Sequence, residues 1–279
     1  MTVYFNGSYQ AKDAVRVSPD DRGFLLGDGV YEVARTYGGR LFALDRHLER
    51  LRYSLGEMRI EGVTVDALGQ VFGELLARND LTTRDALVYL QVTRGAAPRT
   101  HGFPYPPVPP TVYAYASPLR LKFDPAKGVA AVTVPDRRWS RCDIKSISLA
   151  ANVLANQAAQ EAGAFEALLV RDGVALEGSH TSLFSVAGGE VRTAPLSNYI
   201  LPGITRAILL EVCRSAGISA RERPLQLEEL RQADEVFLAG TTAEVLSVVQ
   251  LDGRPVGNGT PGPVTRKLRD LFRAETARR

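Results

Sequence analysis

The 279-residue chain lacks the features that mark several large classes of protein. Its two cysteines, Cys142 and Cys213, are too few for a disulfide framework, and they fit a reducing compartment as buried apolar thiols. No apolar run approaches the roughly 20 residues that cross a bilayer, and residues 1–7 run straight into a strand-like segment without a signal peptide. These absences predict a cytoplasmic protein with no membrane partner.

The sequence also has little excess of charge of either sign. Lys and Arg outnumber Asp and Glu by 34 − 31 = 3, and this small excess is spread along the sequence. Since a nucleic-acid-binding protein usually concentrates its basic residues on one face, we predict no nucleic-acid partner. The sequence also has no internal repeat and no low-complexity segment, and we predict no metal site. An apolar fraction of 45% supports a globular core.

The strand and helix patterns that are present do not alternate regularly, which predicts an α+β fold. Asn6-Gly7 is a strong hairpin signal, and Asp45 is expected to cap a helix with an apolar face. Residues 95–110 form a proline-rich loop, and long loops inside compact domains are often functional. We predict a small N-terminal α+β domain at residues 1–118, a linker at 119–128 and a larger C-terminal domain at 129–279.

Lys145 and Glu177 are the residues that first indicate a chemistry. Lys145 lies in a mainly apolar stretch, 32 residues before Glu177, which is set in a Gly-Ser turn. A lysine can form a Schiff base with an aldehyde cofactor, and a carboxylate can keep a pyridine nitrogen protonated. Taken alone, Lys145 also fits a surface lysine, and Glu177 fits a turn carboxylate that caps Ser179 or Thr181.

A phosphorylated cofactor needs backbone N–H donors, a helix N-terminus and a cation. Gly203-Ile204-Thr205 opens a predicted helix and supplies the first two. Arg50 offers a bidentate cation, and Thr241-Thr242 after a predicted strand adds a hydroxyl group and backbone donors. Each piece alone is also typical of an ordinary helix cap or of a solvated surface arginine.

Taken together, these elements resemble the fold-type IV pyridoxal-phosphate enzymes, and most of all the D-amino acid (D-alanine) aminotransferases. The resemblance runs nearly from end to end, through Gly27-Asp28-Gly29-Val30-Tyr31-Glu32-Val33, His47-Leu48-Glu49-Arg50-Leu51, Arg94 to His101, Asp143-Ile144-Lys145-Ser146, Glu177-Gly178-Ser179, Leu201 to Arg206 and Thr241-Thr242. It implies a small α/β N-terminal domain and a larger, cofactor-binding C-terminal domain of pseudo-barrel form.

The resemblance assigns the cofactor, pyridoxal 5′-phosphate, to named residues. Lys145 would form the Schiff base and carry the proton between the substrate Cα and the cofactor as acid and base. Glu177 would keep the ring nitrogen protonated, and Arg138 would contact the ring hydroxyl side. The remaining cofactor-binding residues that it implies are Arg50, Ser179, Ile204, Thr205 and Thr241.

The same resemblance implies a trap for the substrate carboxylate, made by Tyr31, Arg99 and His101. The Arg-x-His pair is what narrows the family to D-amino acid transaminases. Its loop would reach in from a partner subunit, so a homodimer with shared active sites would be required. Without the resemblance, His101 reads as a loop histidine with no role, and Tyr31 as a strand tyrosine packed in the core.

The implied reaction is transamination between a D-amino acid of the D-alanine type and a 2-oxo acid such as 2-oxoglutarate, by a ping-pong route through pyridoxamine phosphate. A branched-chain L-amino acid aminotransferase, an aminodeoxychorismate lyase and an inactive scaffold are the alternatives. One position departs from the family pattern: His180-Thr181-Ser182 stands where Ser-Ser-Asn is best known, which brings a titratable group to the expected ring face.

Overall fold

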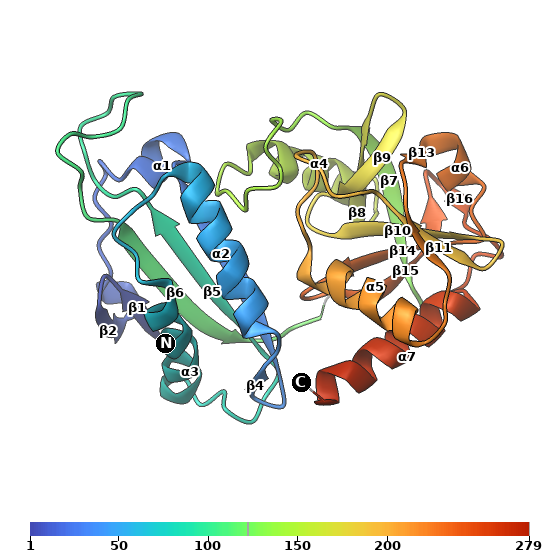
Figure 1. Cartoon of the computed structure of the whole chain (residues 1–279), viewed down its shortest axis with the longest axis horizontal. Coiled ribbons are helices and arrows are strands. Elements are labelled where there is room, and N and C mark those ends of the chain that lie inside the picture. The colour runs from blue at the N-terminus through green and yellow to red at the C-terminus, as the bar shows by residue number, and fades with distance from the viewer. Residues whose placement is uncertain (122, 279) are drawn as a thin grey trace. The chain divides into compact units, whose positions relative to one another are not determined.

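A computed structural model describes residues 1–121 and 123–278, so residue 122 of the expected linker and residue 279 of the expected C-terminal domain lie outside the described residues. The described chain divides into two compact units (Figure 1). Unit 1 comprises residues 1–120 and 144–148, and unit 2 comprises residues 121–143 and 149–279. The segment that carries Lys145 therefore clusters with the N-terminal part of the chain. The domain boundaries themselves stay a prediction.

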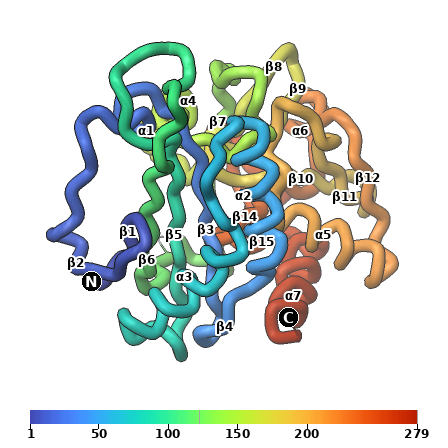
Figure 2. Tube along the Cα trace, turned by 60° about the vertical axis from the view of Figure 1, so that its left-hand side comes forward, coloured from blue at the N-terminus to red at the C-terminus, as the bar shows by residue number. Residues whose placement is uncertain are grey.

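Unit 1 is built on one antiparallel sheet. Its strands are β1 (Thr2–Phe5), β2 (Ser8–Ala11), β3 (Gly29–Tyr37), β4 (Arg40–Leu41), β5 (Ala86–Thr93) and β6 (Thr111–Pro118). Their order across the sheet is β2-β1-β6-β5-β3-β4, and Figure 2 shows β3, β5 and β6 running side by side. The hairpin expected at Asn6-Gly7 is confirmed, since both residues have positive φ between β1 and β2.

The helices of unit 1 are η1 (Lys12–Ala14), α1 (Arg22–Leu26), α2 (Leu44–Met58) and α3 (Val65–Arg78). The core forms where apolar residues of α2 and α3 pack on one face of the sheet, among them Leu51, Phe72 and Leu90. The expectation that Asp45 caps α2 is wrong. The helix already begins at Leu44, its N-cap Ala43 is left-handed with φ 51°, and Asp45 lies in the first turn. There its charge still favours the helix N-terminus.

Four tyrosines cross the other face of this sheet. Tyr31 stacks on Tyr89, Tyr89 stacks on Tyr115, and Tyr113 lies against Tyr115, with ring centroids 5.2–5.8 Å apart. They share a face because side chains alternate along a strand and the three strands pair in register. Burial raises the pKa of the Tyr89 hydroxyl above its ordinary value.

Unit 2 contains a sheet that closes on itself. Its strands are β7 (Val129–Pro135), β8 (Glu166–Arg171), β9 (Val174–Gly178), β10 (Ser182–Ala187), β11 (Glu190–Thr193), β12 (Ala220–Glu222), β13 (Leu225–Gln226), β14 (Glu235–Gly240), β15 (Glu244–Leu251) and β16 (Arg254–Pro255). The path β10-β14-β15-β7-β8-β9 returns to β10 through the pair Glu177↔Ser182. This closure makes a barrel-like ring, and we call the closing pair the seam.

The helices of unit 2 are α4 (Ala150–Glu161), α5 (Ile204–Ser215), α6 (Leu227–Arg231) and α7 (Pro263–Arg278). Leu168, Leu238 and Leu246 lie in the apolar core of the barrel. As predicted, both cysteines are free and buried. In the part of the chain that the structure describes, every helix falls short of the length and apolarity that a bilayer crossing requires.

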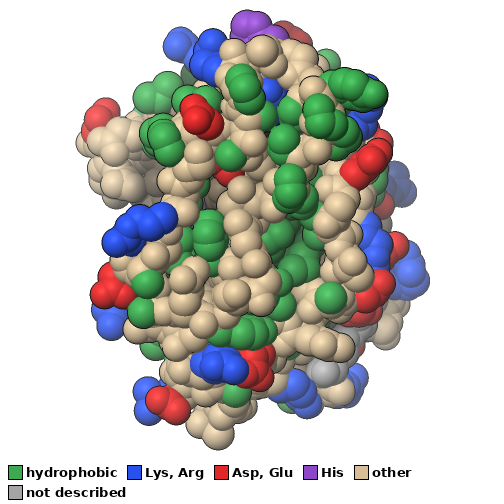
Figure 3. Space-filling model, turned by 90° about the vertical axis from the view of Figure 1, so that its left-hand side faces the viewer, with side chains coloured by type: hydrophobic (Ala, Val, Ile, Leu, Met, Phe, Trp, Pro, Cys, Tyr) green, Lys and Arg blue, Asp and Glu red, His purple; other side chains and the backbone are tan. Residues whose placement is uncertain are grey.

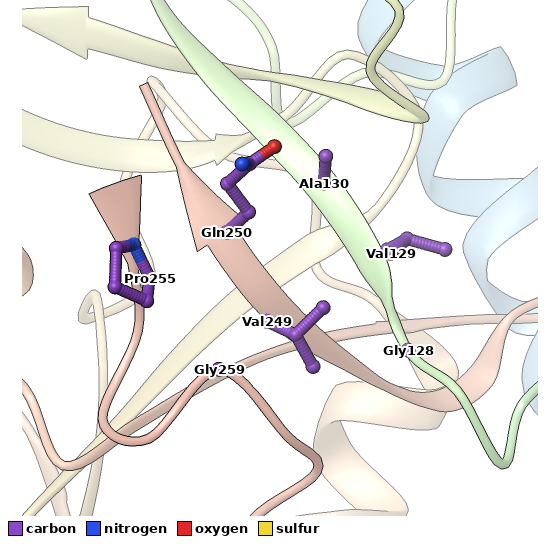
Figure 4. A pocket seen from close by; sticks show the side chains of 7 residues that line it. All are labelled: Gly128, Val129, Ala130, Val249, Gln250, Pro255 and Gly259. Atoms are coloured by element: carbon purple, nitrogen blue, oxygen red, sulfur yellow. The ribbon is translucent and has the colours of Figure 1, made fainter. Parts of the chain in front are cut away.

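A small cavity of about 340 Å³ lies in unit 2 beside the start of β7, and its wall is drawn in Figure 4. Its lining residues are Gly128, Val129, Ala130, Val249, Gln250, Pro255 and Gly259. None of them is a predicted site residue, so we do not propose this cavity as the functional site.

Candidate active site

The predicted site residues fall into two groups, one in each unit. In unit 1, Lys145 lies on a short segment that pairs with the start of β3. Tyr31 N donates to Lys145 O at 3.0 Å, and Ile147 N donates to Gly29 O at 3.0 Å. The backbone of Lys145 is thereby held against the start of β3, next to an isolated antiparallel bridge between Val30 and Ser146, which limits where its side chain can reach.

The Lys145 side chain lies over the ring of Tyr31, with Nζ 4.2 Å from the ring centroid. The electron-rich face of a tyrosine ring attracts a cation at this distance. Lys145 N also donates to Ser54 Oγ at 3.1 Å. The structure thus brings together two predicted site residues, Lys145 and Tyr31, that are more than a hundred positions apart in the sequence.

Arg50 is buried on α2, where it forms an ion pair with Glu32 of β3. Arg50 Nε donates to Glu32 Oε1 at 2.7 Å, and Nη2 donates to Oε2 at 2.9 Å. His47 Nδ1 lies 2.8 Å from the same Oε2. Burial opposes the ionisation of Glu32, but Arg50 and His47 hold the pKa of this carboxyl well below its ordinary value. Burial also lowers the pKa of His47.

Arg99 and His101 are both exposed on the loop between β5 and β6. The backbone between them is held from inside, because buried Arg22 donates through Nη1 to Thr100 O at 2.8 Å. Arg94 supports the same loop, with its guanidinium carbon 3.6 Å from the Phe103 ring centroid. The loop is therefore anchored at its base and presents Arg99 and His101 to the surface. Among the described residues, 1–121 and 123–278, the structure records no contact of Arg99 or His101 with Lys145 or Tyr31.

In unit 2, Glu177 lies at the seam. The sequence placed it in a turn, but it is the penultimate residue of β9, and the connection to β10 follows it at residues 179–181. Its carboxylate is buried and accepts from Leu201 N at 3.2 Å and from the guanidinium of Arg138. Arg138 is in turn paired with Asp136. The structure therefore brings Glu177 and Arg138 into direct contact.

The connection after Glu177 is anchored by Glu166 of β8, whose side chain is fully buried. Glu166 accepts from Ser179 Oγ at 2.6 Å and from Thr181 Oγ1 at 2.7 Å. At Gly178 a Cβ would lie 2.2 Å from Thr181 Oγ1 and 2.6 Å from Glu166 Oε2, so only glycine fits there. Burial opposes the ionisation of Glu166, but His180 and the two hydroxyl groups keep its pKa below the ordinary value.

His180, the departure from the family pattern, is directed toward Glu166. Its Nδ1 lies 3.1 Å from Glu166 Oε2, its ring meets Phe165 edge-on, and about 45% of its side chain remains exposed. It also lines a cavity of about 670 Å³ together with residues of α4 and of the start of β7. We infer that His180 supports the turn through a carboxylate, a role that the sequence did not indicate.

Helix α5 starts beside the seam. Its N-cap is Gly203, which has no side chain to cap the first turn, and the first N–H groups of an α-helix have no acceptor within the helix. A Cβ at Gly203 would lie 2.5 Å from Ser182 Oγ, which shows how closely the helix start approaches β10. Ile204 and Thr205 are buried there.

Thr241 follows β14, the strand next to β10 in the barrel, and the position of a Cβ at Gly240 would lie 3.8 Å from His180 O. Glu177, Ser179, the start of α5 and the Thr241 turn therefore share one end of the barrel. The carboxylate, hydroxyl groups and uncapped helix N-terminus that the sequence predicted separately meet there.

Sequence reasoning missed the carboxylates that hold the predicted residues. Glu32 gave a signal, since it sits at a core-facing position of β3 between Val30 and Ala34, where an unpaired charge would be costly. Asp136 stands two positions before Arg138, which also suggests a pair. Glu166 begins an apolar strand and carries no such signal, because its partners are set by the way β8, β9 and β10 meet.

The chain belongs to the class IV aminotransferases, whose family model, described as Amino-transferase class IV, matches residues 29–251. This membership confirms the resemblance and the α+β fold of type IV, with one closed barrel-like sheet and one separate sheet.

Individual relatives are similar along their whole length. The chain is 42% identical to the D-alanine aminotransferase of Bacillus licheniformis, covering 100% of this chain and 99% of that protein. It is 41% identical to the D-alanine aminotransferase of Staphylococcus haemolyticus, covering 97% and 96%. A solved structure of the branched-chain amino acid aminotransferase of Escherichia coli is similar at a TM-score of 0.91 and 27% identity, covering 98% of this chain and 93% of that one.

Proposed function

We propose that the protein is a pyridoxal-phosphate-dependent D-amino acid transaminase, which moves an amino group between a D-amino acid of the D-alanine type and a 2-oxo acid such as 2-oxoglutarate. The observation that carries this proposal is the 42% identity, over the full length of both chains, to a D-alanine aminotransferase. The branched-chain L-amino acid alternative shares the fold, but at 27% identity, and it has no use for the Arg99–His101 pair.

The residues present fit pyridoxal 5′-phosphate. A phosphate dianion suits the uncapped N-terminus of α5, where close approach is possible because Gly203 has no side chain. A buried carboxylate at Glu177 suits a protonated pyridine nitrogen, and the amine of Lys145 suits an aldehyde. The residues that would hold the phosphate are Arg50, Ile204, Thr205 and Thr241.

When bound, the cofactor supplies an aldehyde that condenses with amines and a ring that takes up the electron pair left at the substrate Cα. The chain's own groups do the rest. Lys145 Nζ carries the proton between the substrate Cα and C4′ of the cofactor. Glu177 holds a proton on the ring nitrogen, and Ser179 fixes the turn behind it through Glu166. Arg138 is the candidate for the ring hydroxyl side.

The substrate carboxylate is assigned to Tyr31, Arg99 and His101, with the last two supplied by a partner subunit of a homodimer. Two observations support the shared site. The loop is anchored from inside while both side chains remain exposed. Large apolar side chains are also exposed in the single chain, including Phe24 at 76% and Leu154 at 71%. Figure 3 shows hydrophobic side chains through the middle of one face, with most charged ones nearer its margin.

A cytoplasmic location stays a prediction that rests on the free cysteines.

Absorbance spectra of the holoenzyme test the substrate assignment. The enzyme is mixed with D-alanine or with L-leucine in the absence of a 2-oxo acid, and the cofactor band is recorded. We expect D-alanine alone to convert the band to that of the amine form, and 2-oxoglutarate to restore it. Conversion by L-leucine alone would move the protein to the branched-chain class. Pyruvate released with aminodeoxychorismate and no acceptor would identify the lyase.

Subunit mixing tests the shared site. Lys145→Ala and Arg99→Ala are each expected to be nearly inactive at low substrate concentration. If Arg99 serves the partner's site, each mixed dimer contains one intact site, and random reassociation should restore about a quarter of the wild-type activity. If Arg99 serves its own subunit, every site in the mixture carries one defect, and no activity returns.

A further inference from the structure

Asp136 is a fully buried carboxylate to which the mechanism above gives no role. It follows β7 directly, and its side chain is 0% exposed. Arg138 Nε donates to Asp136 Oδ1 at 2.9 Å, and Arg138 Nη2 donates to Oδ2 at 3.2 Å. Arg171 Nη2 donates to the same Oδ2 at 3.1 Å. One carboxylate is therefore placed between two guanidinium groups.

Arg138 is held along its whole guanidinium group. In addition to Asp136 it donates through Nη2 to Tyr199 O at 3.0 Å and through Nη1 to Glu177 Oε1. The planar fork of an arginine fixes the direction of each N–H once two of them are bound. Holding Nε and Nη2 from the Asp136 side thus determines that Nη1 is directed at Glu177.

The charges of this cluster decide what Glu177 can bind. Arg138 alone beside Glu177 would form a one-to-one ion pair, and a second cation at the same carboxylate would be disfavoured. With Asp136 on its other side, the charge of Arg138 is divided between two carboxylates. Both members of each ion pair are charged. Burial opposes the ionisation of Asp136, but Arg138 and Arg171 bring its pKa below the ordinary value. Asp136 and Glu177 in turn raise the pKa of Arg138.

We propose that Asp136 is a positioning residue of the cofactor site, which holds Arg138 so that Glu177 stays in place with enough negative charge to pair with a protonated ring nitrogen. This inference rests on the proposed function, in which Glu177 faces that nitrogen. It adds a residue that touches neither cofactor nor substrate and acts through the direction and the charge of Arg138.

The test is the protonation state of the ring nitrogen, read from the 15N chemical shift of labelled cofactor bound to the holoenzyme. Asp136→Asn keeps the size of the side chain but removes its charge, and we expect the shift to move toward the unprotonated form. We also expect kcat to fall on the order of 10-fold or more with KM for D-alanine little changed, since the defect concerns proton and charge placement. Asp136→Glu should restore most of both signals. Asp252→Asn is a matched control, because Asp252 also accepts from an arginine and from Thr133, outside this cluster.

A double-mutant cycle separates this role from a merely structural one. In an Arg138→Gln background no cation competes for Glu177, so adding Asp136→Asn should leave the ring nitrogen shift unchanged. The comparison of Arg138→Gln with the double variant remains usable if Asp136→Asn alone does not fold. The double variant loses one positive and one negative charge, so no unpaired buried charge results from the Asp136–Arg138 pair.

A ring nitrogen that stays protonated in Asp136→Asn, or a shift that moves in the Arg138→Gln background, would overturn the inference. A wild-type enzyme that binds no pyridoxal phosphate, or whose cofactor is unchanged by D-alanine, would instead refute the proposed function. The two failures are thus distinguishable.

Discussion

Replacing Glu32 by Gln tests the central buried contact of unit 1. Glu32 is 1% exposed and accepts two hydrogen bonds from Arg50, while His47 contacts one of the same oxygens. Glutamine keeps one acceptor oxygen but replaces the other by an NH2 group, which faces N–H donors that it cannot satisfy. The guanidinium of Arg50 then lacks its countercharge inside the core, and breaking a buried pair in this way costs roughly 3–5 kcal/mol of folding free energy.

Urea unfolding of the apoenzyme measures this cost, and hydrogen exchange of peptides from β3 and α2 shows whether the loss is local. Glu74→Gln is the matched control, since Glu74 pairs with Arg78 on an exposed helix face and its loss should cost no more than about 0.5 kcal/mol. If Arg50 binds phosphate, added cofactor gives it a second anion and should recover part of the stability of Glu32→Gln. A Glu32→Gln enzyme within about 1 kcal/mol of wild type would refute the reasoning.

Three further outcomes are expected. Arg99→Ala should raise KM for the amino acid by roughly 10- to 100-fold, because it removes a charge-assisted contact worth about 1.5–3 kcal/mol. The absorbance spectrum of the bound cofactor should not change. Loss of that spectrum would mean that Arg99 has a structural role instead. Gly178→Ala should weaken cofactor binding, because its Cβ collides with Thr181 Oγ1. Gly73→Ala, with open space around it on α3, should instead stabilise the protein by about 0.5–1 kcal/mol, which urea midpoints will measure.

The stability of the protein should also fall on the acid side. The unfolded chain takes up a proton at His47 below its ordinary pKa near 6.5, while the folded chain, in which that pKa is lowered, takes it up only at a lower pH. Glu32 adds a further loss that begins below its ordinary pKa of about 4.5, where the unfolded chain takes up a proton there, and continues until the pH falls through the lowered pKa of the folded protein. Urea midpoints that stay level from pH 7 to pH 5 would contradict this.

The sequence predicted groups of residues better than it predicted their partners. Lys145 and Tyr31 were named for separate roles and are in contact. Glu177 was placed in a turn because Gly178-Ser179 follows it, but the barrel seam extends β9 through both Glu177 and Gly178. A local turn signal could not reveal a strand whose partner is set by barrel closure.

Arg50 shows a second limit. A cation on a helix gave no information about its carboxylate, because Glu32 lies 18 positions earlier on a strand that only the tertiary fold brings beside α2. The helix start was misjudged for a related reason. Asp45 has the composition of a cap, but the left-handed backbone at Ala43 already turns the chain into α2.

The segment 144–148 makes the two units inseparable by a single cut. The chain leaves unit 1 after residue 120, returns to it at residue 144 and leaves again after residue 148. A protein cleaved near residue 120 should therefore stay together as a noncovalent pair, since the C-terminal fragment still contributes the segment that pairs with the start of β3. Neither fragment alone contains a complete unit 1, so Lys145 is held against the sheet of unit 1 only when both pieces are present.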